Sequence, residues 1–223
     1  MNHYEVENKL VVFVDVLRNT STMTAALFHG IEKVKPFAKV EEVMAYQGKA
    51  NYITAGERQG IKIPEFDKGN SPLAFVDQDN AGKTLVITST NGTQSVHLSK
   101  EAAILTCGSF VNETVLKNFI IEKNMPTLLL ASGWRNNMSL EDTLFVGRLV
   151  ELLKNDFEQI GDPSIMAHAV YKQAEQVGMK EFVMQGAHYM RIRVTDENDD
   201  IDYCFSTDVA PVVPLYDGEF LRV

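Results

Sequence analysis

The chain has 223 residues, of which 45% are hydrophobic and 23% are charged, and this balance excludes intrinsically disordered and fibrous proteins. It carries 21 lysines and arginines against 30 aspartates and glutamates, and the resulting formal charge of −9 argues against general nucleic-acid binding. No apolar run reaches the roughly 20 residues that span a bilayer, and no secretory leader is visible. Cys107 and Cys204 provide no disulfide framework, so we expect a cytoplasmic protein. From its charge and its short apolar runs, we expect that it contacts neither nucleic acids nor membranes.

Short apolar runs alternate with amphipathic stretches along the chain. The continuous β-branched run at 10–16 is typical of a strand that is buried on both faces. Residues 56–72 are rich in glycine, proline and charge, which predicts a loop. We expect further strands at 34–38, 51–54, 84–88, 104–107, 127–131 and 201–205. We expect helices at 22–29, 40–47, 95–99, 111–122, from Ser139 onward, at 165–177 and at 181–191.

Strands that alternate with helices predict βαβ units, and hence a parallel sheet covered by helices on both faces. Near the C-terminus, two β runs flank Asp217-Gly218, a strong hairpin signal that makes the sheet mixed. The predicted fold class is therefore α/β, a three-layer α/β/α arrangement with a mixed, largely parallel sheet and a C-terminal β-hairpin. We expect one domain over residues 1–223, with two lobes that meet near residues 124–140 as an alternative.

Polar loops follow four of the expected strands, at the edge of the sheet where ligands bind in such folds. They combine serine, threonine and asparagine with glycine or arginine just before a helix, and they comprise residues 15–22, 89–93, 108–112 and 132–137. Hydroxyls and backbone N–H groups at a helix N-terminus bind anions, helped by the positive end of the helix dipole. Each loop taken alone is read as helix capping. Together the four loops predict one shared site for an oxyanion.

Carboxylates accompany these loops. Asp15 ends a buried strand, where an unpaired charge is costly, so it needs a bound cation or Arg18 as a partner. Hard oxygen ligands beside a phosphate suit Mg²⁺, which takes one or two carboxylates and keeps several waters. The candidate ligands are Asp15, Glu57, Glu141 and Asp142. For Asp142, a capping role with Ser139 is an equal alternative.

The histidines and cysteines give weaker signals. The five histidines show no zinc-ligand spacing, and His97 and His188 are expected to lie on helix faces. Cys107 stands just before a polar loop and is an alternative nucleophile. A cysteine at a strand end is, however, more often a small buried hydrophobic residue.

Six segments of the chain form an ordered set of motifs: DVLRNTSTM at 15–23, AGERQG at 55–60, FDKGNSP at 66–72, TSTNGT at 88–93, GSFVN at 108–112 and SLEDTLFVG at 139–147. In this order they resemble the motifs of the 2-phosphosulfolactate phosphatase (ComB) family. The chain departs from the family pattern at Asn19, where a small residue is common. A weaker match covers AHYMRI at 187–192 and the segments that follow it. Single motifs of this kind are weak, whereas the ordered set spans nearly the whole chain and is specific.

The resemblance implies a Mg²⁺-dependent phosphatase that hydrolyses 2-phospho-3-sulfolactate, or a similar phosphorylated hydroxy acid, to 3-sulfolactate and phosphate in coenzyme M biosynthesis. The expected catalytic residues are Asp15, Arg18 and Glu57, and Asp15 is either a metal ligand or a phosphoryl-accepting nucleophile. The expected substrate-binding residues are Thr20, Ser21, Thr22, Arg58, Asn70, Ser71, Thr90, Asn91, Gly92, Thr93, Ser109 and Asn112.

Two other functions stay open at this point. One is a non-catalytic binding protein for a small polyanion, and the other is a thiol-dependent hydrolase that uses Cys107. The expected partner is in either case a small anionic ligand, with a phosphate ester as the first candidate. A homodimer is also expected, because two-fold dimers are the commonest soluble oligomers.

Overall fold

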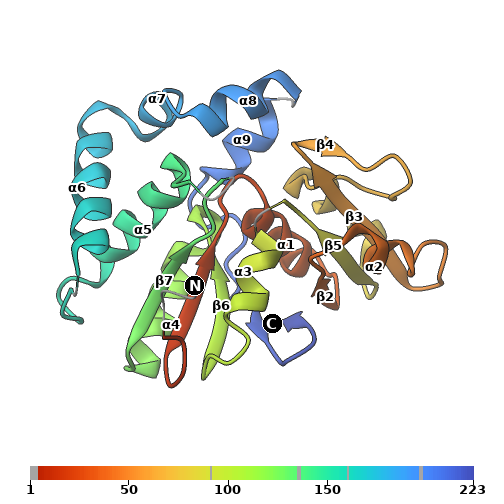
Figure 1. Cartoon of the computed structure of the whole chain (residues 1–223), viewed down its shortest axis with the longest axis horizontal. Helices are drawn as coiled ribbons and strands as arrows, with labels where there is room; N and C mark the ends of the chain where they lie inside the picture. The colour runs from red at the N-terminus through yellow and green to blue at the C-terminus, as the bar shows by residue number, and fades with distance from the viewer. Residues whose placement is uncertain (1–4, 91, 135–136, 160, 196–197) are drawn as a thin grey trace.

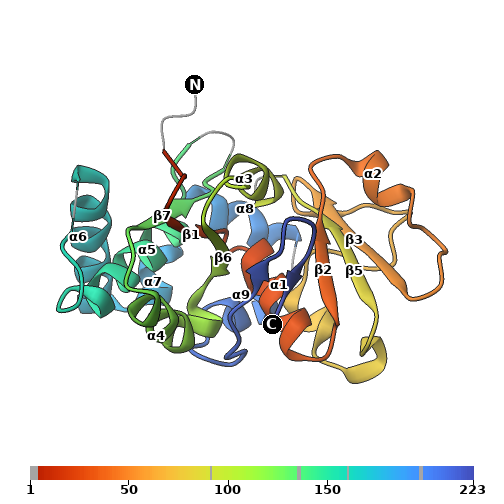
Figure 2. The same cartoon turned by 90° about the horizontal axis from the view of Figure 1, so that it is seen from below.

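The structure is a computed structural model that describes residues 5–90, 92–134, 137–159, 161–195 and 198–223. An open sheet with helices on both faces makes up the molecule (Figures 1 and 2). Within the described ranges the sheet has nine strands in the order β4-β3-β5-β2-β9-β8-β6-β1-β7. These strands are β1 (Leu10–Val14), β2 (Lys33–Pro36), β3 (Tyr52–Arg58), β4 (Ile61–Lys62), β5 (Thr84–Thr88), β6 (Ile104–Gly108), β7 (Thr127–Ala131), β8 (Leu215–Tyr216) and β9 (Leu221–Arg222).

The helices alternate with the strands over the first two thirds of the chain and then follow one another. The α-helices are α1 (Asn19–Phe28), α2 (Val40–Met44), α3 (Gly92–Leu98), α4 (Glu113–Lys123), α5 (Leu140–Leu153), α6 (Asp162–Val177), α7 (Met179–Val183), α8 (Ala187–Thr195) and α9 (Asn198–Cys204). Short 3₁₀ turns are η1 (Pro72–Phe75), η2 (Gln78–Asn80) and η3 (Phe110–Asn112).

Two parallel groups of strands form the sheet. In one group β1 lies between β6 and β7, and in the other β5 lies between β2 and β3. The C-terminal hairpin joins the groups, since β8 pairs antiparallel with β6 and β9 pairs antiparallel with β2. The carboxyl ends of β1, β3 and β5 all approach the centre of the molecule (Figure 1). The loops that follow these strands therefore meet although they belong to different groups.

Strand β1 shows why the sheet is covered on both faces. Leu10, Val12 and Val14 pack with residues of α4 and α5, whereas Val11 and Phe13 pack with residues of α1 and α3. Accordingly, α3 and α4 lie on opposite sides of the sheet (Figure 2). All five side chains of the strand are fully buried, as expected for a continuous apolar run. The predicted α/β fold with a mixed sheet and a terminal hairpin is confirmed.

The strand predicted at 201–205 is wrong, because most of these residues belong to helix α9. The run IDYCF is short and mostly apolar or aromatic, which suits a strand, but Ile201 and Cys204 are also spaced by one helical turn. Both side chains are buried in the core cluster that includes α5. Five residues are too few to distinguish a strand from a helix by their pattern, and here the burial of Ile201 and Cys204 on one face favours the helix.

Several other boundaries also differ from the sequence prediction, and two of these differences affect elements that line the pocket described below. The helix expected at 181–191 is divided into α7 and α8 around Gly186, whose N–H donates to the carbonyl of Val183. Glycine is a poor interior helix residue, and here it lies in a turn between two helices. The loop expected at 56–72 begins later, because β3 continues to Arg58 and forms a hairpin with β4. Across the described ranges, no helix is both long and apolar enough to cross a membrane.

Candidate functional site

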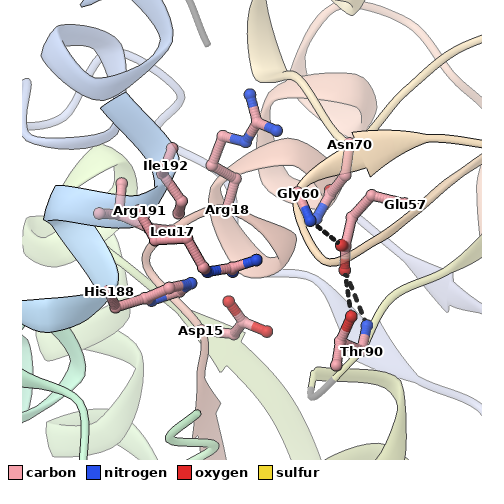
Figure 3. A pocket seen from close by; sticks show the side chains of 10 residues that line it. All are labelled: Asp15, Leu17, Arg18, Glu57, Gly60, Asn70, Thr90, His188, Arg191 and Ile192. Atoms are coloured by element: carbon pink, nitrogen blue, oxygen red, sulfur yellow. Dashed lines mark hydrogen bonds between the residues drawn. The ribbon is translucent and has the colours of Figure 1, made fainter. Parts of the chain in front are cut away.

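A pocket opens where the two parallel groups of strands meet helix α8 (Figure 3). Three sides contribute to it: the loop after β1, the hairpin and loops around β3 and β5, and one face of α8. Its lining residues are Asp15, Leu17, Arg18, Glu57, Gly60, Asn70, Thr90, His188, Arg191 and Ile192.

Asp15 occupies the centre of this pocket, one residue beyond the end of β1. Its side chain is 6% exposed, and its Oδ1 accepts a weak hydrogen bond from the backbone N–H of Asn19 at 3.4 Å. Burial raises the pKa of Asp15 to about 6, with nearby Glu57 and Glu141 adding to the rise and His188 opposing it. A carboxylate perturbed in this way inside a pocket is typical of a functional site.

The first turns of α1 hold the Asp15 loop in place. Thr20 Oγ1 donates to the Asp15 carbonyl at 2.8 Å, and Ser21 Oγ donates to the Val16 carbonyl at 2.9 Å. These hydroxyls, predicted to bind a phosphate, are fully buried and turned back on the chain. Thr22 is also fully buried, and its Oγ1 has no hydrogen-bond partner within the described residues.

Asn19 and Gly92 lie directly beside Asp15. A Cβ atom at Gly92 would lie 2.2 Å from Nδ2 of Asn19 and 2.6 Å from Oδ2 of Asp15, so only glycine permits this approach. The Asn19 side chain is fully buried, and neither of its amide atoms has a hydrogen-bond partner among the described residues. An orphaned buried amide costs about 1–3 kcal/mol, so a bound ligand that satisfies it would be favoured here.

Glu57 fastens two loops on the far wall of the pocket (Figure 3). Its Oε1 accepts from the N–H and the hydroxyl of Thr90, at 2.8 and 2.9 Å, and its Oε2 accepts from the Gly60 N–H at 2.6 Å. The carboxylate therefore ties the β3–β4 turn to the loop after β5.

Asp142 does the same work between two other loops. Its Oδ1 accepts from the Val16 N–H at 2.9 Å, and its Oδ2 accepts from the Gly133 N–H at 3.0 Å. Burial and the neighbouring Glu141 and Asp15 raise the pKa of Asp142 well above its usual value. Its hydrogen bonds join the loops after β1 and β7. This role differs from the alternative given by the sequence, in which Asp142 would cap the start of α5 together with Ser139.

Helix α8 contributes His188, which the sequence analysis placed on a helix face and did not assign to the site. His188 Nδ1 lies 2.5 Å from Oε1 of Glu141, and the two side chains are only 7% and 1% exposed. The His188 ring stacks on Trp134 with 5.7 Å between centroids and 12° between planes. The carboxylate and the indole thus fix the imidazole orientation, while the ring points into the pocket toward Asp15 (Figure 3).

Arg191 lies one helical turn after His188 and also faces the pocket (Figure 3). Its guanidinium carbon lies 5.0 Å from the centroid of the Trp134 ring, which is a cation–π distance. His188 and Arg191 thus share one aromatic support.

Arg18, predicted to be catalytic, lines the pocket but points away from Asp15 (Figure 3). Its Nη1 donates to Oδ2 of Asp200 on α9 at 2.5 Å, and Ser71 Oγ donates to Oδ1 of the same carboxylate at 2.7 Å. Asn70 also lines the pocket, and its Oδ1 has no partner within the described residues. Asp200 therefore positions the Arg18 side of the pocket, a role that the sequence did not indicate.

Other predicted binding residues lie outside the pocket lining. Arg58 donates to Thr88 Oγ1 at 3.0 Å, and Thr93 Oγ1 donates to the Ser89 carbonyl at 3.2 Å. Ser109 and Asn112 bond to each other, and Asn112 Nδ2 donates to the Val212 carbonyl at 2.9 Å. The loop after β6 therefore anchors the C-terminal segment and does not join the pocket. Asn91 lies outside the described residues.

Cys107 is fully buried, and burial raises the pKa of its thiol to about 12. It packs with residues of α1 on the face of the sheet opposite α5. A thiol without access to solvent and without thiolate character is not an effective nucleophile.

A divalent cation fits the surroundings of Asp15. Among the described residues, no three His, Cys, Asp or Glu side chains are grouped so that they could hold a metal ion together. Mg²⁺ needs only one or two carboxylates when waters and substrate phosphate supply the other ligands. The buried Asp15 carboxylate, with the orphaned Asn19 amide beside it, meets that requirement.

Comparison with known proteins gives one consistent result. The family model described as 2-phosphosulpholactate phosphatase matches residues 1–219. A protein of Clostridium novyi named probable 2-phosphosulfolactate phosphatase is 34% identical over 95% of this chain and 91% of its own length. Proteins of the same name from Clostridium acetobutylicum and Gloeothece citriformis are each 34% identical, over 97% and 92% of this chain and 94% and 87% of their own lengths.

Proposed function

The chain belongs to the 2-phosphosulfolactate phosphatase family of phosphoric monoester hydrolases, and we propose that it hydrolyses 2-phospho-3-sulfolactate or a similar phosphorylated hydroxy acid. The products are 3-sulfolactate, or the corresponding hydroxy acid, and inorganic phosphate. Coenzyme M biosynthesis is the proposed setting of this reaction. The observation that carries the proposal is the buried Asp15 carboxylate in a pocket that also holds His188, oriented by Glu141.

We assign Mg²⁺ binding to Asp15. The carboxylate would hold the ion, with the Asn19 amide oxygen as a neighbouring donor. When bound, Mg²⁺ polarises a phosphoryl oxygen and orients the attacking water. Glu57 lines the same pocket and is the next candidate ligand. Glu141 and Asp142 are assigned to positioning, since Glu141 bonds His188 and Asp142 bonds two backbone N–H groups.

Other side chains would act at the two ends of the scissile bond, which are the phosphoryl group and the ester oxygen of the leaving group. On the β3–β5 side, Asn70 lines the pocket and its amide N–H would donate a hydrogen bond to a phosphoryl oxygen, whereas the donors of Thr90 are held by Glu57. On the α8 side, Nε2 of His188 holds a proton that passes to the ester oxygen as the bond to phosphorus breaks. Glu141 keeps the imidazole in the orientation that this transfer needs.

The two alternatives from the sequence are less well supported. A thiol-dependent hydrolase would require an accessible thiolate at Cys107, which is fully buried. A polyanion-binding protein without catalysis has no use for a proton donor fixed by a buried carboxylate. A homodimer and a cytoplasmic location stay predictions, and analytical ultracentrifugation of the purified protein tests the first of them.

The test is an assay of phosphate release from 2-phospho-3-sulfolactate and 2-phospholactate, with Mg²⁺ present and after chelation. We expect turnover of at least one ester that depends on the added ion. Saturable binding of both esters without any release of phosphate would favour the binding-protein alternative. Release that is unchanged after chelation would remove the ion from the mechanism.

A further inference from the structure

We propose that Arg191 on α8 binds the second acidic group of the substrate, the carboxylate or sulfonate of the leaving hydroxy acid. This inference rests on the proposed phosphatase function and extends it to the choice of substrate. It makes the enzyme selective for phosphorylated hydroxy acids over phosphate monoesters that lack a second acid. The sequence analysis placed Asn70 and Ser71, on the opposite side of the pocket, among the expected substrate-binding residues.

On the opposite side of the pocket, the side chains of Arg18 and Ser71 already contact another side chain of the protein. The hydroxyl of Ser71 donates to Asp200 at 2.7 Å, and the guanidinium of Arg18 pairs with the other oxygen of the same carboxylate at 2.5 Å. Both members of the Arg18–Asp200 pair are more than nine-tenths buried. The negative charge of Asp200 offsets that of Arg18, so this wall offers little net attraction for a second anion.

On the α8 side of the pocket, an aromatic ring supports the cationic side chain of Arg191. Arg191 faces the pocket and stacks over Trp134, which also supports His188 through a parallel ring contact. Glu141 in turn anchors His188. An arginine held on an aromatic face loses less side-chain freedom when it binds a ligand, and its planar fork matches a carboxylate or sulfonate.

The spacing on α8 places Arg191 at the correct end of the substrate. Residues three apart on a helix are neighbours, with about 5–6 Å between Cβ atoms. If His188 serves the ester oxygen, the acid group on the adjacent carbon of the leaving group reaches Arg191. Asp15 and Glu57 make the rest of the pocket acidic, so a substrate with two acidic groups needs a cation at this point.

A pair of matched substrates tests the inference. In 2-phospholactate the carbon that bears the phosphate also bears a carboxylate, and in isopropyl phosphate a methyl group replaces that carboxylate. We expect Arg191→Ala to lower kcat/KM for 2-phospholactate about 10- to 100-fold, because a hydrogen bond between charged groups is lost. The same substitution should change kcat/KM for isopropyl phosphate less than threefold. Arg191→Lys, which keeps the charge but not the fork, should recover part of the loss.

The matched control is Arg193→Ala. Arg193 is an exposed arginine two residues further along α8 and is absent from the pocket lining. This variant removes the same charge from the same helix, and we expect it to leave both substrates unaffected. An equal loss on both substrates in Arg191→Ala would overturn the inference, because it would mean that Arg191 acts on the phosphoryl group or on folding.

A binding measurement separates this inference from the proposed function. Titration calorimetry with 3-sulfolactate and with inorganic phosphate needs no turnover. We expect Arg191→Ala to raise the Kd of 3-sulfolactate about 10- to 100-fold and to leave that of phosphate unchanged. Unchanged 3-sulfolactate binding, or no binding of it to the parent protein, would overturn the role of Arg191. Absence of phosphate release from every ester by the parent protein would instead overturn the phosphatase function.

Discussion

Nδ1 of His188 lies 2.5 Å from Oε1 of Glu141, and this contact joins α8 to the first turn of α5 at the edge of the pocket. The two residues are far apart in sequence, and both are buried. A histidine held by a carboxylate and directed toward a perturbed aspartate is an arrangement for proton transfer.

We expect His188→Gln to lower kcat about 10²- to 10⁴-fold, since it removes the proton donor for the leaving oxygen. Glu141→Gln should lower kcat less, because the imidazole stays but loses its orienting anion. His168→Gln is the matched control, as His168 pairs with Glu151 at 2.5 Å outside the pocket. Steady-state phosphate release measures all three. Equal effects of the His168 and His188 substitutions would contradict the assignment.

The Arg18–Asp200 pair should contribute more to stability than a surface ion pair. Both side chains are more than nine-tenths buried, and Asp200→Ala removes a buried carboxylate that Arg18 and Ser71 both contact. We expect the free energy of unfolding to fall by about 3–5 kcal/mol in urea titration. The double variant Arg18→Met with Asp200→Leu should recover much of that loss. A loss below 1 kcal/mol in the single variant would show that the pair is not a buried anchor.

Gly92 should tolerate no side chain. The added methyl group of Gly92→Ala would lie 2.2 Å from Nδ2 of Asn19 and 2.6 Å from Oδ2 of Asp15. We expect Mg²⁺ affinity and activity to fall more than tenfold, because the Asp15 carboxylate must move. Gly69→Ala is a useful comparison, since a Cβ there makes only an ordinary contact, 3.5 Å from the Cβ of Lys62. If titration calorimetry with Mg²⁺ gives the same Kd for Gly92→Ala and the parent protein, the close approach of Gly92 to Asp15 is not needed for Mg²⁺ binding, which would contradict this prediction.

The raised pKa of Asp15 predicts a pH-dependent cost in the metal-free protein. Its folded pKa of about 6 exceeds the unfolded value of 3.8, so the folded state retains the proton more strongly. The stability this provides is complete below about pH 4 and is lost as the pH rises through 6. Asp15→Asn, which stays neutral, should therefore unfold less readily than the parent protein at pH 7.5 without Mg²⁺.

The expected gain in Asp15→Asn is on the order of 2–3 kcal/mol, from about 1.4 kcal/mol per unit of pKa. Urea titrations at pH 4.5 and 7.5 measure it as a difference between the two proteins. Added Mg²⁺ should stabilise the parent protein and not the variant. If the variant is less stable than the parent protein at pH 7.5 without Mg²⁺, the ionised Asp15 carries no such cost.

The position of Asp15 could be predicted from the sequence, and the structure places it in the pocket lining directly after β1. A continuous apolar run ends at Val14, so the first polar residue after it had to emerge at the carboxyl edge of the sheet. The same logic placed Thr90 after β5 and led to the pocket. These predictions depend on local periodicity and on the topology of parallel strands, both of which the sequence contains.

The α8 wall could not be predicted in the same way. His188 and Arg191 reach Asp15 only because α5, α7 and α9 pack α8 against the carboxyl end of β1, and no short pattern encodes that docking. The spacing of His188 and Arg191 by one helical turn was the available signal, within a weaker motif. Asp200 was hidden because the run that follows it was read as a strand.

The prediction that four loops share one anion site was too broad. The loop after β6 carries Ser109 and Asn112, and the side chain of Asn112 bonds the carbonyl of Val212. The C-terminal hairpin inserts beside β6, which turns this loop toward residues 208–212. Helix-start residues of the same type therefore serve as an anchor here, which sequence alone does not distinguish from anion binding.

The central claim is that the carboxylate of Asp15 is essential for hydrolysis in this pocket. The most direct test is the kcat/KM for phosphate release from 2-phospho-3-sulfolactate by Asp15→Asn at saturating Mg²⁺. Asp79→Asn, which makes the same change at an exposed site, is the control. We expect a loss of at least 10³-fold for Asp15→Asn, since groups central to phosphoryl transfer contribute several kcal/mol, and none for Asp79→Asn. A loss below tenfold for Asp15→Asn would contradict the account.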